Sequence, residues 1–175
     1  MTHQALRKQL WVRGAVLAAL AGTVLVWPDR APEALIGMLA LFVLADGIVT
    51  AVYGMRSLSL VRWIAIAQGT VSGVVGVAAL IVSDDPTVAL TQIFAVWAIV
   101  VGVLDMGAAI RMDNSEVGGL LGVSGVLSVA VGIILAVASS DIGLLIGLFG
   151  AYQLGRAAVL LTAAARVPFA QPPSE

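Results

Sequence analysis

The chain has 175 residues, of which 61 % are hydrophobic and 11 % are charged, with a net charge of −1. So few charged residues cannot cover a water-soluble surface, and we expect most of the chain to lie in a lipid bilayer. The basic residues form no patch of the kind that a phosphate backbone requires, which excludes a nucleic-acid partner. Because cysteine is absent and His3 is the only histidine, no metal site, disulfide or cofactor is expected.

Six apolar segments follow one another along the chain, separated by short stretches that contain charged residues, serine or proline. A helix needs roughly 20 apolar residues to cross the hydrocarbon layer, and each segment approaches or exceeds this length. The segments are continuous and lack the period-2 alternation of barrel strands. The sequence therefore predicts an all-α polytopic membrane protein with six transmembrane helices. Their expected positions are residues 10–27, 32–54, 61–83, 86–110, 117–139 and 142–165.

The links between these segments alternate between very short and longer ones. This alternation predicts that the helices pair as tight hairpins, the first with the second, the third with the fourth and the fifth with the sixth. The hairpins would occupy residues 10–56, 61–112 and 117–166 of a single membrane domain, followed by a short polar tail at 167–175.

Nine glycines recur along the chain in three series whose intervals are nearly equal, which indicates three copies of one hairpin. The three series are Gly14, Gly69 and Gly125; Gly22, Gly76 and Gly132; and Gly47, Gly102 and Gly155.

Some glycines also form stripes along single helices, because steps of 4, 3 and 7 residues place them on one helix face. Such faces let two helix backbones approach closely in lipid. We expect them to pack within the chain, with packing between subunits of a homo-oligomer as the alternative. The stripes are Gly69, Gly73 and Gly76, and Gly118, Gly122, Gly125 and Gly132.

Lys and Arg residues lie almost entirely on one side of the predicted helices, which places both termini in the cytoplasm. Trp11, Tyr53 and Trp63 near this boundary, and Trp27 near the other, fit the aromatic belts of a membrane protein. The basic residues on the predicted inner side are Arg7, Lys8, Arg13, Arg56, Arg62, Arg111 and Arg166.

Three ionisable residues interrupt the apolar segments: Asp46, Asp105 and Arg156. A charge at the bilayer centre costs roughly 2.5–3.5 kcal/mol on insertion scales, so such groups normally face the protein interior and are paired. Each lies close to a repeat glycine in an even-numbered helix, so we expect the three to approach one another around a common axis.

Arg13 and Gln68 extend this set, because each directly precedes the first repeat glycine of its own hairpin, as Ser124 does in the third. With Arg13 the set holds two positive and two negative charges. One interpretation is that the charges hold the hairpins in register. The alternatives are that Asp46 or Asp105 titrates along a proton or ion pathway, and that Arg13 extends to the interface.

No arrangement typical of an enzyme is present. The sequence has no histidine placed as a base, no nucleophile elbow and no phosphate-binding glycine loop. We therefore expect no enzymatic activity.

Several motifs mark the first hairpin: Trp11-Val12-Arg13-Gly14, Gly22, Trp27-Pro28 and Ala45-Asp46-Gly47. This set resembles the opening hairpin of the HdeD-type acid-resistance membrane proteins. The resemblance implies a bacterial inner-membrane protein with six helices and a role in survival of acid or other stress. It supplies no catalytic residues. The third hairpin departs from the pattern, because Arg156 replaces the carboxylate near the even-helix glycine.

An alternative to the stress role is that the protein is a small channel or transporter for protons, ions or a solute, in which Asp46 and Asp105 take part.

Overall fold

The computed structural model describes residues 3–26, 32–55, 59–81, 86–112, 116–137 and 142–166, and these form six α-helices. Each has at least 22 residues, which at 1.5 Å per residue gives about 33 Å, enough to cross a bilayer. The helices are α1 (His3–Val26), α2 (Pro32–Gly54), α3 (Ser59–Ile81), α4 (Pro86–Arg111), α5 (Glu116–Val137) and α6 (Ile142–Arg166).

The four helices from α3 to α6 are long and apolar enough to cross a membrane by themselves. The apolar parts described for α1 and α2, Leu10–Val26 and Gly37–Val52, are shorter. The chain is thus an all-α membrane protein of six helices, as predicted. The predicted C-terminal tail lies outside the described residues.

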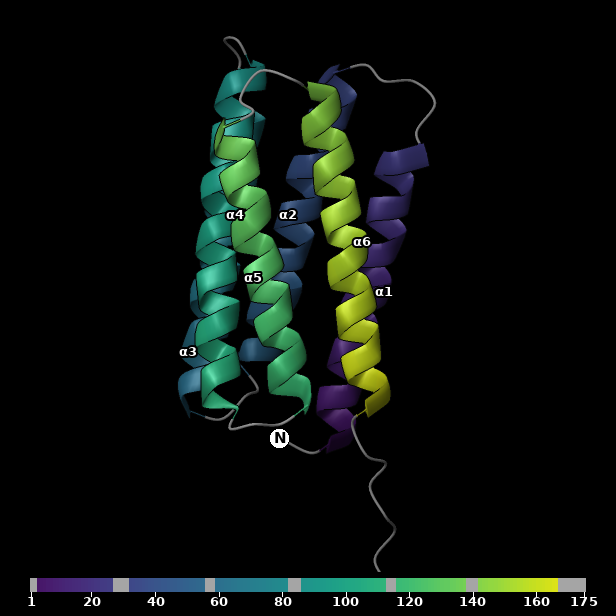
Figure 1. The fold of residues 1–175 in the computed structure, drawn as a ribbon, viewed down its shortest axis with the longest axis vertical. Helices are drawn as coiled ribbons and strands as arrows, with labels where there is room; N and C mark the ends of the chain where they lie inside the picture. Colours follow the sequence, from purple (N-terminus) through teal and green to yellow (C-terminus); the bar gives the residue numbers. More distant parts are fainter. Residues whose placement is uncertain are drawn as a thin grey trace, which may run out of the picture.

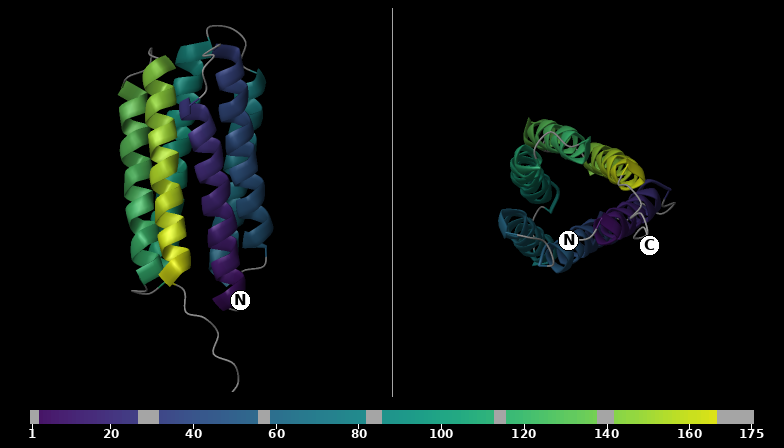
Figure 2. Two further views of the ribbon diagram at one scale, coloured as in Figure 1. Left: turned by 90° about the vertical axis from the view of Figure 1, so that its right-hand side faces the viewer. Right: turned by 90° about the horizontal axis from the view of Figure 1, so that it is seen from below.

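The six helices stand side by side along the long axis of the molecule (Figure 1). They form a closed ring in chain order, in which each helix contacts the next and α6 contacts α1 (Figure 2). Consecutive helices run in opposite directions, so α1 begins and α6 ends at the same end of the bundle, which we call the terminal end.

The closest helix packing lies between the predicted hairpins. The tightest pairs are α2 with α3, α4 with α5, and α1 with α6, whereas the two helices of each predicted hairpin contact one another less. The expectation that the closest packing occurs within each hairpin was therefore wrong. The physical reason is that the small residues of each odd helix face the even helix of the neighbouring repeat.

Glycine against glycine brings two of these pairs together. A Cβ atom added to Gly69 would lie 2.8 Å from the carbonyl oxygen of Gly47, and one added to Gly125 would lie 2.7 Å from that of Gly102. Both distances are too short for a side chain opposite a backbone atom. The two helix backbones therefore touch at these points, which is the arrangement that compensates for the missing hydrophobic drive in lipid.

The α1 and α6 pair follows the same pattern with a different residue. A Cβ atom on Gly14 would lie 3.3 Å from the carbonyl oxygen of Ala157, whereas nothing lies within 4 Å of Gly155. Ala157 is therefore the structural equivalent of Gly47 and Gly102, and the step from Gly102 to Ala157 equals the step from Gly47 to Gly102. The assignment of Gly155 to this series was wrong by two positions.

A second contact lies two helical turns further along each odd helix. It shows that the predicted series Gly22, Gly76 and Gly132 is also wrong at one position. Cβ atoms on Gly76 and Gly132 would lie 3.0 and 2.7 Å from carbonyl oxygens of α2 and α4. The matching residue of α1 is the buried Ala21, while Gly22 has nothing within 4 Å. In this pair the glycine is on α6 instead, because Gly150 faces the side chain of Leu25.

The predicted glycine stripes divide between these contacts and open positions. Gly69, Gly76, Gly125 and Gly132 pack against the neighbouring even helix, and Gly118 is buried. Gly73 has nothing within 4 Å, and Gly122 reaches only the Cβ atom of Ala109, at 3.6 Å. Packing within the chain thus accounts for most of both stripes.

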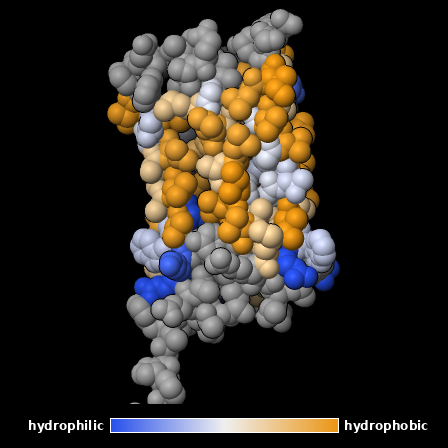
Figure 3. Space-filling model, turned by 180° about the vertical axis from the view of Figure 1, so that it is seen from behind, coloured by the Kyte–Doolittle hydropathy of each residue, from blue (hydrophilic) through white to orange (hydrophobic). Residues whose placement is uncertain are grey.

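The face of the bundle opposite to the view of Figure 1 carries an apolar band, with hydrophilic residues toward the terminal end (Figure 3). Trp11 and Trp63 are 45 % and 61 % exposed, as expected of side chains at a membrane interface. Trp27 and the side chain of Tyr53 lie outside the described residues.

Candidate functional site

Four charged side chains meet inside the ring, one from each of α1, α2, α4 and α6. All four are buried, with at most 8 % of any residue exposed. We call this set the charge tetrad: Arg13, Asp46, Asp105 and Arg156.

Arg13 and Asp46 form the closest pair. Nε of Arg13 donates to Oδ1 of Asp46 at 2.8 Å, and Nη2 donates to Oδ2 at 3.3 Å. The guanidinium therefore binds both carboxylate oxygens, which is the bidentate geometry in which Arg binds a carboxylate most strongly. Arg13 does not extend to the interface, because its pairing keeps it buried.

Arg156 connects the other two members of the tetrad. Its Nη2 donates to Oδ2 of Asp105 at 3.1 Å, and its Nη1 lies 3.7 Å from Oδ2 of Asp46. The ion pairs thus connect the four side chains in the spatial order Arg13, Asp46, Arg156, Asp105. The sign of the charge alternates along this row, and the four charges sum to zero. Removal of one member leaves a buried charge without compensation, which typically costs about 3–5 kcal/mol.

The tetrad residues of the even helices can be aligned by the contact residues Gly47, Gly102 and Ala157. Asp46 and Arg156 directly precede the equivalent residues Gly47 and Ala157, so they occupy the same place in the first and third repeats, and Val101 occupies it in the second. Asp105 lies about one helical turn nearer the terminal end. The third repeat therefore supplies a cation where the first supplies an anion.

Gln68 lies on α3 beside the carboxylate of Asp105. It is 4 % exposed, and its Nε2 interacts with Asp105 without reaching standard hydrogen-bond geometry to any described residue. Ser124, the equivalent residue of α5, is also buried. Arg13, Gln68 and Ser124 thus all point away from lipid, but only the first two reach the tetrad.

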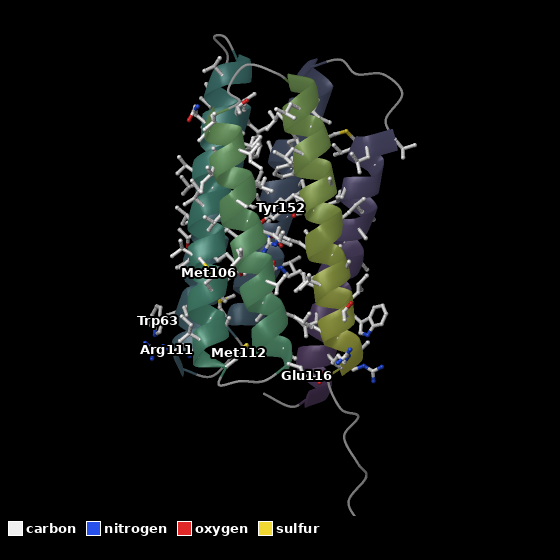
Figure 4. The ribbon with its side chains drawn as sticks, in the orientation of Figure 1. Trp63, Met106, Arg111, Met112, Glu116 and Tyr152 are labelled. Atoms are coloured by element: carbon white, nitrogen blue, oxygen red, sulfur yellow. The ribbon has the colours of Figure 1, made fainter. Side chains whose placement is uncertain are left out.

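Five aromatic side chains fill the ring on the side of the tetrad away from the terminal end. Phe149 lies at their centre, with ring centroids of four neighbours at 5.2 to 6.4 Å. Figure 4 shows Tyr152, one of the five, in the middle of the bundle. We call this set the aromatic layer: Phe42, Phe94, Trp97, Phe149 and Tyr152.

The layer is joined to the odd helices and to the tetrad. Nε1 of Trp97 donates to Oγ of Ser72 at 2.9 Å, and the hydroxyl of Tyr152 hydrogen-bonds that of Ser128. Cζ of Arg156 lies 5.7 Å from the centre of the Tyr152 ring, within cation–π range. These contacts link the two helices of the second repeat and the two helices of the third.

The aromatic layer was not expected from the sequence. The signal was present, because Phe42, Trp97 and Tyr152 stand at equivalent places in the three repeats, and so do Ser72 and Ser128, the serines that bind the last two. Alignment of the glycines alone does not identify these positions.

At the terminal end, polar contacts are exposed. Nη1 of Arg166 binds Oε2 of Glu116 at 3.0 Å, and Arg62 lies over the ring of Trp63 at 5.7 Å. Figure 4 places Glu116 and Trp63 at this end. Among the residues that the structure describes, no group of three or more His, Cys, Asp or Glu residues could hold a metal ion.

Two stretches of the chain, residues 12–81 and 67–137, match the family model described as "Short repeat of unknown function (DUF308)". Together they cover residues 12–137, well over half of the chain. The offset between their starts equals the offset between Gly47 and Gly102, the glycines of the even-helix contacts. No curated protein and no solved structure matches the chain.

Proposed function

This chain belongs to the DUF308 family of short repeats, and we propose that it protects a bacterial cell against acid or general stress from within the cytoplasmic membrane. HdeD-type proteins belong to the same family, and the motifs of the first hairpin resemble theirs. The six apolar helices and the internal repeat are consistent with this role.

The neutral charge tetrad is the observation that carries the proposal. Its two cations and two anions are paired with one another inside the chain, and the aromatic layer fills the ring next to them. Such an arrangement supports a bundle whose role depends on its presence in the bilayer, without catalytic turnover. The chain then needs neither substrate nor cofactor.

The distribution of basic residues supports an orientation with both termini in the cytoplasm. The terminal end is where α1, α3 and α5 begin and α2, α4 and α6 end. By the positive-inside rule, the side richer in Lys and Arg faces the cytoplasm. The basic residues of the described helices near this end are Arg7, Lys8, Arg62, Arg111 and Arg166.

A survival assay tests the proposed role. The chain is expressed in a bacterium that lacks its own short-repeat proteins, and survival is counted after transfer to acid. We expect survival above the empty-plasmid strain, lost in Asp46→Asn and kept in Arg166→Gln, which breaks only an exposed ion pair. Membrane levels of each variant are measured in parallel. Wild-type protein that is present in the membrane but gives no protection contradicts the proposal.

A proton or ion pathway through Asp46 and Asp105 is the second candidate. It is favoured by the buried polar atoms of the tetrad that have no hydrogen-bond partner among the described residues, such as Nε of Arg156. Purified protein in liposomes with a pH gradient separates the two candidates. Flux that is abolished in Asp105→Asn supports a pathway, and flux no faster than in empty liposomes excludes it.

A further inference from the structure

Arg156 has fewer hydrogen-bond partners than its charge and burial require. A guanidinium carries five N–H donors. Nη2 of Arg156 makes a hydrogen bond to the tetrad and the guanidinium also interacts with Tyr152, while Nε and Nη1 have no hydrogen-bond partner among the described residues. The 3.7 Å between Nη1 and Asp46 is too long for a direct hydrogen bond. The residue is 2 % exposed, so bulk water does not satisfy these groups.

The unpartnered buried side-chain atoms in the described part of the bundle are mainly donors. Four of the six are nitrogen donors, one is a hydroxyl and only one is a pure acceptor. Buried donors without partners are costly, and an acceptor-rich ligand relieves that cost. The six atoms are Thr50 Oγ1, Gln68 Nε2, Gln153 Nε2, Gln153 Oε1, Arg156 Nε and Arg156 Nη1.

The two carboxylates of the tetrad are held unequally. Asp46 faces two guanidiniums, those of Arg13 and Arg156, whereas Asp105 makes an ion pair with Arg156 alone among the residues that the structure describes. Asp105 is therefore the carboxylate that we expect to carry a proton when the bundle is acidified. The ionisable and polar groups that face it are Arg13 from α1, Asp46 from α2, Gln68 from α3, and Arg156 and Tyr152 from α6, while the described part of α5 has its only ionisable residue, Glu116, at the terminal end.

We propose that the acid form of this protein, with a proton on Asp105, binds a small monovalent anion such as chloride at Arg156. The proton comes from the water phase and neutralises the carboxylate that Nη2 of Arg156 now holds. The tetrad then carries one net positive charge, and the bound anion returns it to zero. Nε and Nη1 of Arg156 supply donors that are already free.

The proposal predicts that chloride and protons bind together. If only the protonated form binds chloride, the apparent affinity falls roughly tenfold for each pH unit above the titration of Asp105. Chloride binding to the purified full-length chain in detergent is measured by calorimetry at neutral and acidic pH, with gluconate as the control anion. In unbuffered solution at the pH where Asp105 titrates, addition of chloride should take up protons, so the pH should rise.

Two variants locate the site. Asp105→Asn, which cannot take a negative charge, should bind chloride at neutral pH with an affinity that no longer depends on pH. Arg156→Gln should lose binding at every pH, and Arg166→Gln, at the exposed pair, should behave as wild type. Should Arg156→Gln not fold, the wild-type proton uptake and Asp105→Asn still decide the question.

Three results overturn the proposal: no chloride binding at either pH, equal affinity at both, or binding that persists in folded Arg156→Gln. The first result leaves internal water as the partner of the free donors. The proposal requires neither the stress role nor ion flux, and binding to purified protein is measured apart from cell survival. Failure of the chloride-binding proposal can therefore be told apart from failure of the stress role or of ion flux.

Discussion

Asp46 and Arg156 occupy the same place in the first and third repeats and carry opposite charges. They lie 3.7 Å apart at their closest charged atoms, across the interior of the ring. A strict threefold repeat would bring like charges together here. Because the first and third repeats differ at this position, the two side chains attract one another, whereas two identical charges would repel.

Loss of Asp46 should therefore destabilise the whole bundle. Asp46→Asn leaves the buried guanidinium of Arg13 with an amide in place of a carboxylate, and removes the nearer anion from Arg156. We expect a loss of about 3–5 kcal/mol, seen as a lower midpoint of thermal or denaturant unfolding in detergent.

The exposed pair provides a matched control. Glu116→Gln removes an ion pair whose side chains are more than half exposed, and should change the unfolding midpoint little, since such pairs contribute roughly 0–1 kcal/mol. Equal stability of Asp46→Asn and wild type would show that the tetrad does not hold the bundle together.

The glycine contacts give a second prediction: substitution by alanine should destabilise the bundle where a glycine packs against a backbone, and should not do so where the glycine has no neighbour. Gly69→Ala and Gly125→Ala place a methyl group against a backbone oxygen at 2.8 and 2.7 Å, so the helices must separate and the bundle is destabilised. Gly73→Ala and Gly155→Ala meet nothing within 4 Å. There, the better helix propensity of alanine should leave stability unchanged or raise it by roughly 0.5–1 kcal/mol.

Unfolding of these four variants under one condition tests the corrected register directly. If Gly155→Ala were as harmful as Gly125→Ala, the original assignment of Gly155 to the even-helix contact would be right and Ala157 would not take its place.

Much of this fold could be predicted from sequence, because helix length and the position of charges depend on the bilayer. The predicted segments lie within a few residues of the observed helices except at the start of α1, and Asp46, Asp105 and Arg156 do come together. The closest helix pairs could not be read in the same way. At Ala21 and Ala157 an alanine fills the place of a glycine, so matching glycine with glycine shifts the register by one or two positions.

The aromatic hydrogen bonds yield a third prediction. Trp97→Phe keeps most of the ring packing but leaves Oγ of Ser72 without its buried donor. We expect a loss of about 0.5–1.5 kcal/mol from the hydrogen bond, with some further loss from the smaller ring. In a double-mutant cycle with Ser72→Ala, the two changes should cost less together than the sum of each alone.

The matched control is Trp63→Phe, at an exposed ring that contacts Arg62. It should change stability by a few tenths of a kcal/mol, as surface substitutions usually do. Strict additivity of Trp97→Phe and Ser72→Ala would mean that the hydrogen bond contributes nothing to folding.

Closure of the ring by α1 and α6 gives the last prediction, because no loop joins these two helices. The side chain of Leu25 lies 2.6 Å from where a Cβ atom on Gly150 would be, so Leu25→Cys with Gly150→Cys should form a disulfide on mild oxidation. The sequence has no cysteine to compete. With a protease site inserted between α4 and α5, the two fragments should stay joined in denaturing gels until a reductant is added.

A control pair shows whether the cross-link reports the native contact. Leu25→Cys with Gly119→Cys places the second thiol on the other fragment, at a position of α5 with no neighbour within 4 Å and outside the α1 and α6 pair. Its fragments should separate after cleavage even under oxidation. If the first pair also separated, α1 would not pack against α6 and the ring would be open. In that case Arg13 and Arg156 could not both face Asp46, because this carboxylate is held from both sides only when the first and last helices meet.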